Sequence, residues 1–84
     1  LETFTALDVL INAAKTGGTM PAAVNAANEE AVALFLSGRI GFLDIGEVLR
    51  EVYNNHCTIK DFDLEALLRV DLETRQKVKA DYEN

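Results

Sequence analysis

The amino-acid sequence predicts an all-α protein, a small bundle of four to five helices around a central helix at about residues 21–37. Alanine is abundant and strand-forming residues are few, which favours helix over sheet. Apolar residues recur every three or four positions in several segments, and glycines and capping residues separate those segments. With 84 residues, the chain is expected to form a single helical domain over residues 1–84.

The first helix is expected to open at Thr5, because Asp8 stands three residues later in a capping box. Phe4 is placed to pack on Val9 across this helix start. The helix should stop at the glycine pair 17–18, where left-handed backbone is easily adopted. Its predicted buried face has four members: Leu7, Leu10, Ile11 and Ala14.

The central helix is predicted from the most charge-poor stretch of the chain, residues 17–46. Pro21 suits the first turn of a helix, and no breaker follows from Ala22 to Ser37. The only charged residues of its predicted span are Glu29 and Glu30. A helix this poor in charge is expected to be wrapped by the others and to end at Gly38.

The third helix is predicted from the clearest amphipathic pattern in the chain. Asp44 is expected to be its N-cap, with Glu47 at the capping-box distance. The preceding apolar connector, residues 40–43, should turn into the core. The predicted inward stripe comprises Ile45, Val48, Leu49, Val52, Tyr53 and His56.

The C-terminal third is predicted to hold a loop and two short helices. Residues 54–61 are expected to form the loop, and Asp63 to cap a helix that turns Leu64, Leu67 and Leu68 inward. A fresh N-cap is expected at Asp71, beginning a weakly held last helix that ends at about Tyr82. Its inward residues are expected to be Leu72, Val78 and Tyr82, and Glu73 and Lys77 form its favourable i, i+4 pair.

The composition excludes several classes of partner. The net charge of −6 argues against nucleic acid and against an anionic membrane, because both require a basic surface. No apolar run approaches the ~18 residues that span a bilayer. Cys57 is the single cysteine, so no intrachain disulfide can form and a reducing compartment fits. The chain begins without Met, which is typical of a fragment or a processed chain.

Two motifs suggest chemistry but lack the residues to perform it. His56 and Cys57 are adjacent, yet a structural zinc site needs four ligands, and neighbours on one turn seldom face each other as a nucleophile pair. The glycine pair before Thr19 and Pro21 resembles an anion-binding helix start, yet no Gly-Lys-Ser/Thr follows. A helix stop followed by a helix start explains these residues better.

The polar residues of the central helix are expected to be structural. Glu29 and Glu30 are sequential and so point about 100° apart, which disfavours a paired-carboxylate site. Asn25 and Asn28 are expected to satisfy backbone groups of the 17–20 turn or the 40–43 connector. On this interpretation Asn28→Ala costs ~1–3 kcal/mol for each buried group left unpaired. We therefore predict no catalytic, cofactor-binding or metal-binding residue in this chain.

Three motifs in order resemble the C-terminal domain of the 1-deoxy-D-xylulose 5-phosphate reductoisomerase family. Residues 17–21 match a Gly-Gly-Thr-x-Pro turn, residues 25–29 an Asn-Ala-Ala-Asn-Glu helix, and residues 40–45 an Ile-x-Phe-x-Asp-Ile connector. Residues 4–8 resemble the Phe-Pro-x-Leu that opens the domain, with Thr5 in place of proline. Residues 68–71 and Arg75 resemble the Asp and Arg of the family's terminal helix.

The resemblance implies a helical C-terminal domain whose role is structural. The family enzyme rearranges and reduces its sugar phosphate with NADPH and a divalent metal, Mg or Mn, in the non-mevalonate route to isoprenoids. The resemblance places the NADPH-binding domain and the catalytic domain with its metal ligands outside these residues. It therefore implies partners in those missing domains of the same chain, and a bacterial cytoplasmic or plastid-type location.

Two other classes of function stay open at this point. The chain could be a free-standing helical protein-protein interaction module, or a small anion-binding protein that uses the turn at residues 17–21. A charge-poor central helix and a weakly held last helix also predict self-association, as a homodimer.

Overall fold

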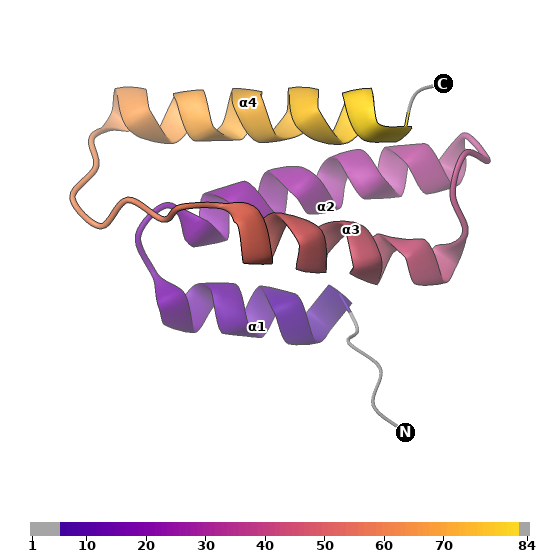
Figure 1. Ribbon diagram of the computed structural model, residues 1–84, viewed down its shortest axis with the longest axis horizontal. Helices are drawn as coiled ribbons and strands as arrows, with labels where there is room; N and C mark the ends of the chain where they lie inside the picture. The colour runs from indigo at the N-terminus through magenta and orange to yellow at the C-terminus, as the bar shows by residue number, and fades with distance from the viewer. Residues whose placement is uncertain (1–5, 83–84) are drawn as a thin grey trace.

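A computed structural model describes residues 6–82 and contains four α-helices. They are α1 (Ala6–Thr16), α2 (Met20–Leu36), α3 (Phe42–Asn55) and α4 (Leu64–Tyr82), and no strand occurs within this part of the chain (Figure 1). The predicted all-α fold and the predicted central helix are therefore confirmed.

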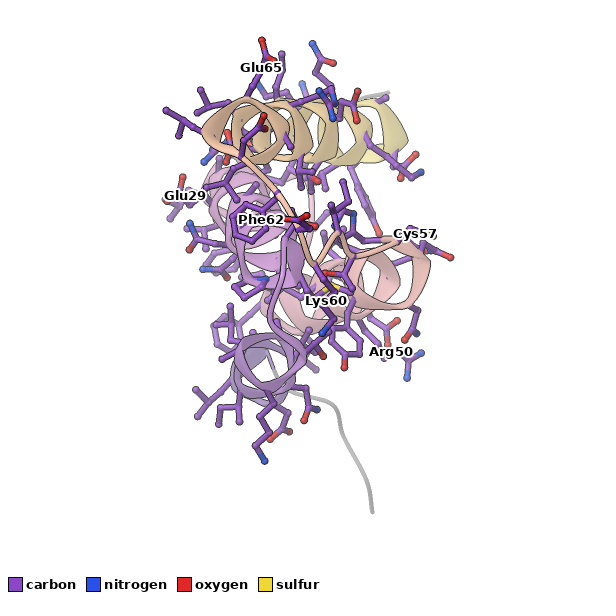
Figure 2. The ribbon with its side chains drawn as sticks, turned by 90° about the vertical axis from the view of Figure 1, so that its left-hand side faces the viewer. Glu29, Arg50, Cys57, Lys60, Phe62 and Glu65 are labelled. Carbon is purple, nitrogen blue, oxygen red and sulfur yellow. The ribbon has the colours of Figure 1, made fainter. Side chains whose placement is uncertain are left out.

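Helix α2 lies against each of the other three helices. Figure 1 shows α2 and α4 running in one direction, with α1 and α3 running in the other. Seen along the helices in Figure 2, α4 lies over α2, α3 lies to one side, and α1 lies below. The stack α1–α2–α4 thus forms one side of the molecule, and α3 covers the other side of α2.

The core is built around small side chains on α2. Four alanines of this helix, Ala23, Ala26, Ala27 and Ala31, are completely buried. Because a methyl group projects so little from the backbone, neighbouring helices pack close to α2. The larger side chains that fill the remaining space come from all four helices: Val9, Met20, Val24, Leu34, Ile45, Val48, Leu49 and Val78.

Helix α2 ends at Leu36, and Gly38 takes the left-handed position just beyond the C-cap, as predicted. This glycine has a left-handed φ of +82°, and its N–H donates to the Phe35 carbonyl over 3.0 Å. The Arg39 N–H donates to the Leu34 carbonyl over 2.9 Å. These two bonds form a Schellman motif, which satisfies carbonyls that the helix end would otherwise leave unpaired.

The predicted inward face of α1 is only partly correct: Leu10 packs partly buried against the core, but the other three members are exposed. Val9 and Ala13 are buried, whereas Leu7 is 64% exposed and Ile11 is 46% exposed. Helix α1 contacts both α2 and α3, and the small side chains at positions 9 and 13 fit that narrow seam. The larger leucine and isoleucine are left outside. The predicted roles of Phe4 and Thr5 lie outside the described residues.

The start of α3 also differs from the prediction. The helix begins at Phe42, and Asp44 occupies its third position, where its carboxylate accepts the Gly41 N–H over 2.8 Å. This bond stabilises a helix start three residues earlier than expected. Phe42 and Leu43 are therefore 70% and 79% exposed and do not enter the core. The predicted stripe is confirmed, with its first three members buried and its last three partly buried.

Helix α4 is continuous where two helices were predicted. Asp63 caps it as expected, since its carboxylate accepts the Ala66 N–H over 2.8 Å. Asp71 is not a second N-cap, because its carboxylate accepts Arg75 Nε over 2.9 Å and so does not compete for backbone N–H groups.

The side-chain predictions for α4 are partly wrong. Leu64, Leu68 and Leu72 are 69%, 60% and 56% exposed, whereas Val70 and Val78 are buried. The expected pair of Glu73 with Lys77 is also replaced, because Lys77 Nζ lies 3.1 Å from Asp81 Oδ2.

Two leucines of α3 test this core. Leu49 is fully buried and Leu43 is 79% exposed, although the sequence predicted both to be inward. Leu49→Ala should lower the free energy of unfolding by about 2–5 kcal/mol, because it removes buried surface and leaves a cavity. Leu43→Ala should change it by less than about 0.5 kcal/mol. Urea denaturation compares the two; equal losses would contradict the position of Leu43.

Candidate functional site

The most polar contact of the interior joins the α1–α2 turn to the loop after α3. We call it the threonine junction, residues 16–20 with residues 56–60. Thr19 is completely buried there. Its N–H donates to the Ile59 carbonyl over 3.1 Å, and the Ile59 N–H donates to Thr19 Oγ1 over 2.9 Å. This reciprocal pair fixes the two segments in register.

Thr58 also belongs to the junction and bonds to the α1–α2 turn. Its hydroxyl accepts the Met20 N–H over 3.1 Å and donates to the Gly17 carbonyl over 3.2 Å. Lys60 Nζ donates to the Thr16 carbonyl over 2.6 Å, and Figure 2 shows Lys60 on the loop at this end of the bundle. The junction therefore supplies partners for the polar backbone groups between two helices, which would otherwise be costly to bury.

Glycine is required at position 18 for two reasons. Its φ is +60°, a conformation that other residues adopt at a cost. A Cβ there would lie 2.7 Å from both the Ile59 carbonyl oxygen and Thr58 Oγ1. Close approach of the loop thus explains Gly18, whereas Gly17 has open space around it and a left-handed φ of +75°.

His56 completes the junction. It ends α3, with its N–H donating to the Val52 carbonyl over 2.9 Å, and its Nε2 lies 2.9 Å from Thr19 Oγ1. The Thr19 hydroxyl has one proton to donate and two lone pairs, one of which accepts the Ile59 N–H, so the imidazole tautomer sets the direction of its bond with Nε2. Burial lowers the pKa of His56 and so favours the neutral imidazole.

The junction leaves little for an external ligand to bind. An anion at the start of α2 would need free N–H groups, but those of Thr19 and Met20 already donate to Ile59 and Thr58. Cys57 is exposed and free, while the neighbouring imidazole is engaged by Thr19. Within residues 6–82 no three His, Cys, Asp or Glu side chains come together as metal ligands.

A second polar cluster joins α2 to α4 through Arg75. Its guanidinium lies 2.6 Å from Glu29 Oε1 and 3.4 Å from Glu30 Oε2, and its Nε donates to Asp71. Hydrogen bonds to Asp71 and then Glu29 raise the pKa of Arg75, so the side chain stays cationic. The adjacent glutamates therefore serve as ion-pair partners. The sequence signals of this cluster were the family-like Asp71 and Arg75 and their i, i+4 spacing, whereas the pairing with Glu29 and Glu30 was not predicted.

A groove of about 330 Å³ separates α3 from α4. Val52 and Val78 contribute apolar surface to it, and Glu51 and Lys77 line it with charge. Tyr82 also lines it, and its pKa is raised by burial and by the nearby Glu51. Among the described residues, the groove is lined by apolar side chains and by side chains of both charges. They do not converge on one point as catalytic groups would.

The predicted roles of the two asparagines are wrong. Asn25 is exposed and Asn28 is partly buried, and within the described part of the chain neither amide makes a hydrogen bond. Thr19 and Thr58 satisfy the 17–20 turn instead. The expected loss of stability in Asn28→Ala consequently has no basis in this structure.

No helix among residues 6–82 is long and apolar enough to cross a membrane.

Thr19 provides a test of the junction. Thr19→Val keeps the side-chain volume but leaves the partly buried Ile59 N–H without its acceptor, at an expected cost of about 1–3 kcal/mol in unfolding free energy. Thr19→Ser retains the hydroxyl and should recover most of that loss. Thermal or urea unfolding measures both, and equal destabilisation by the two variants would contradict the role of the hydroxyl.

His56 makes stability depend on pH. Its pKa is lower when folded than its ordinary value of 6.5, so the unfolded chain binds the proton more readily. The stabilisation is complete above pH 6.5 and is lost as the pH falls from there through the lower folded pKa. The melting temperature should therefore fall over this range more steeply than in His56→Gln, which does not titrate. Parallel slopes for the two proteins would contradict this linkage.

Comparison with known proteins identifies a family whose sequences are similar to this chain. Residues 1–77 match the family model described as the DXP reductoisomerase C-terminal domain. No solved structure matches the chain.

Three bacterial relatives carry the printed name 1-deoxy-D-xylulose 5-phosphate reductoisomerase. The protein from Caldanaerobacter subterraneus is 46% identical over 81 residues, which cover 96% of this chain and 21% of the relative. That from Listeria monocytogenes serotype 4a is 50% identical over 78 residues (93% and 20%), and that from Acetivibrio thermocellus is 46% identical over 79 residues (94% and 21%). The chain thus spans about a fifth of the length of these relatives. It belongs to the family of DXP reductoisomerase C-terminal domains.

Proposed function

We propose that this chain is the structural C-terminal domain of a 1-deoxy-D-xylulose 5-phosphate reductoisomerase and is not catalytic by itself. The match over residues 1–77, set against only a fifth of each relative's length, carries this proposal. The polar clusters of the domain support it, because Thr19, His56 and Arg75 are occupied by internal partners. The domain's role is then to support the rest of the enzyme.

The parent enzyme would convert 1-deoxy-D-xylulose 5-phosphate to 2-C-methyl-D-erythritol 4-phosphate, an oxidoreductase step in isoprenoid biosynthesis. It would use NADPH and Mg or Mn. The described residues do not fit either group, since they present no cluster of metal ligands and the N–H groups of Thr19 and Met20 are engaged. Both groups would be held by the other domains of the parent chain. A bacterial cytoplasmic or plastid-type compartment is proposed with this activity.

A free-standing interaction module is the second candidate, because several large apolar side chains are exposed on α4 and at the α2–α3 connection. The homodimer also stays a prediction: the same side chains would favour self-association of the isolated chain at high concentration. The full coding sequence distinguishes these candidates, since the module requires a reading frame whose 5′ end lies near residue 1.

Oxidation of NADPH tests the proposed function. The full-length protein, supplied with 1-deoxy-D-xylulose 5-phosphate and Mg²⁺ or Mn²⁺, should consume NADPH. The 84-residue chain at the same molar concentration should not. Absorbance at the NADPH band follows both reactions. Turnover by the short chain, or none by the full-length protein, would refute the proposal.

A further inference from the structure

We propose that one face of the bundle, formed by α2 and α4, is the surface on which the remainder of the reductoisomerase docks. We call it the α2–α4 face and define it by seven residues: Asn25, Asn28, Val32 and Leu36 on α2, and Leu64, Leu68 and Leu72 on α4. This inference rests on the proposed function, and it adds the location of the interface within this domain.

The α4 part of the face is a row of leucines. Leu64, Leu68 and Leu72 follow one another at intervals of four, so they lie along one side of the helix. They are 69%, 60% and 56% exposed, although each is a large apolar side chain. Because Val70 and Val78 already bury α4 against the bundle, this leucine row is additional apolar surface.

The α2 part of the face combines apolar and amide side chains. Val32 and Leu36 are 36% and 77% exposed. Asn25 lies seven positions before Val32 and therefore on the same side of α2. Neither Asn25 nor Asn28 makes a hydrogen bond within residues 6–82, so both amides are available to a partner. This mixture is typical of interfaces between domains of one chain.

The Arg75 cluster makes these two parts one continuous surface. Arg75 stands three residues after Leu72, and Glu29 stands four residues after Asn25 and three before Val32. The 2.6 Å contact from Arg75 to Glu29 therefore brings the leucine row beside the exposed side of α2. Figure 2 shows Glu29 at the edge where α4 lies over α2.

The opposite side of the molecule has a different character. The outer positions of α3 between its first turn and its end are charged or amide residues: Glu47, Arg50, Glu51 and Asn54. Arg50 lies away from Glu29 across the bundle in Figure 2. The large exposed apolar side chains of α4 are thus concentrated on the α2–α4 face, while the outer side of α3 suits water.

The remainder of the parent chain fits this face better than a second copy of the domain. About four-fifths of each relative lies outside the matched region, so a large protein surface accompanies the domain in those proteins. A second copy would carry the same net charge of −6, and this repulsion opposes pairing in dilute solution. Docking of the rest of the chain needs no such approach, because it is covalently linked.

Thiol labelling tests the proposal directly. In a Cys57→Ser background, single cysteines are placed at Leu68 and Val32 on the face and at Arg50 as the matched control. Each variant is made both in the full-length enzyme and in dilute 84-residue chain, and its reaction with a maleimide is timed. In the full-length enzyme, labelling at positions 68 and 32 should be about tenfold slower or more, because the docked interface must open first. Position 50 should label at the same rate in both.

The outcomes of the labelling and of the NADPH assay separate the docking face from the proposed function. Equal labelling of all three sites in the full-length enzyme would overturn the docking face, and NADPH oxidation by the same sample would show that the proposed function still holds. Slow labelling of positions 68 and 32 in the dilute short chain would also overturn it, because the face would then be covered without the remainder of the enzyme. Absence of NADPH oxidation by the full-length Cys57→Ser parent would instead count against the proposed function.

Discussion

The Thr19 hydroxyl holds together segments of the chain that helix formation alone would leave apart. It accepts the Ile59 N–H and contacts His56 Nε2, both about forty residues away in sequence. Each bond is individually modest, but a buried donor without a partner is costly, so the junction must form as a unit. Gly18 makes the approach of the loop sterically possible, and Thr58 satisfies the turn beside it. The junction thus fixes how α1, α2 and α3 are placed relative to one another.

Helix α2 occupies the centre because its side chains are small. Its buried alanines permit close packing on several sides, and α4 adds a polar clamp through Arg75. That clamp is partly exposed, so solvent weakens its contribution to stability, and its value is mainly in fixing the register of α4 on α2. The same register sets where the leucine row lies relative to the exposed side of α2. Structural support and the proposed interface thus depend on one set of contacts.

The polar residues that suggest chemistry in the sequence are used for architecture in the structure. His56 bonds to Thr19 at the end of α3, Glu29 and Glu30 pair with Arg75, and the start of α2 is closed by backbone and threonine partners. Membership of the DXP reductoisomerase C-terminal family agrees with such a supporting role. In this reading, the proposed activity of the parent enzyme belongs to the portion of the relatives that this chain does not match.

Local signals in the sequence determined the helical class, the central helix, the left-handed stop at Gly38 and the cap at Asp63. These features depend on residues within one or two turns of each other, so spacing and capping chemistry suffice to predict them. Tertiary structure decided which stripe of α1 and α4 is buried, because both helices carry apolar residues on more than one side. Small Val9 and Ala13 fit the seam that α1 forms with α2 and α3, while Leu7 stays outside it; on α4, Val70 is buried and Leu68 is exposed. The partners of Thr19 and the α2 partners of Arg75, Glu29 and Glu30, were also decided there, since they lie 37–46 residues away and no local periodicity encodes such contacts.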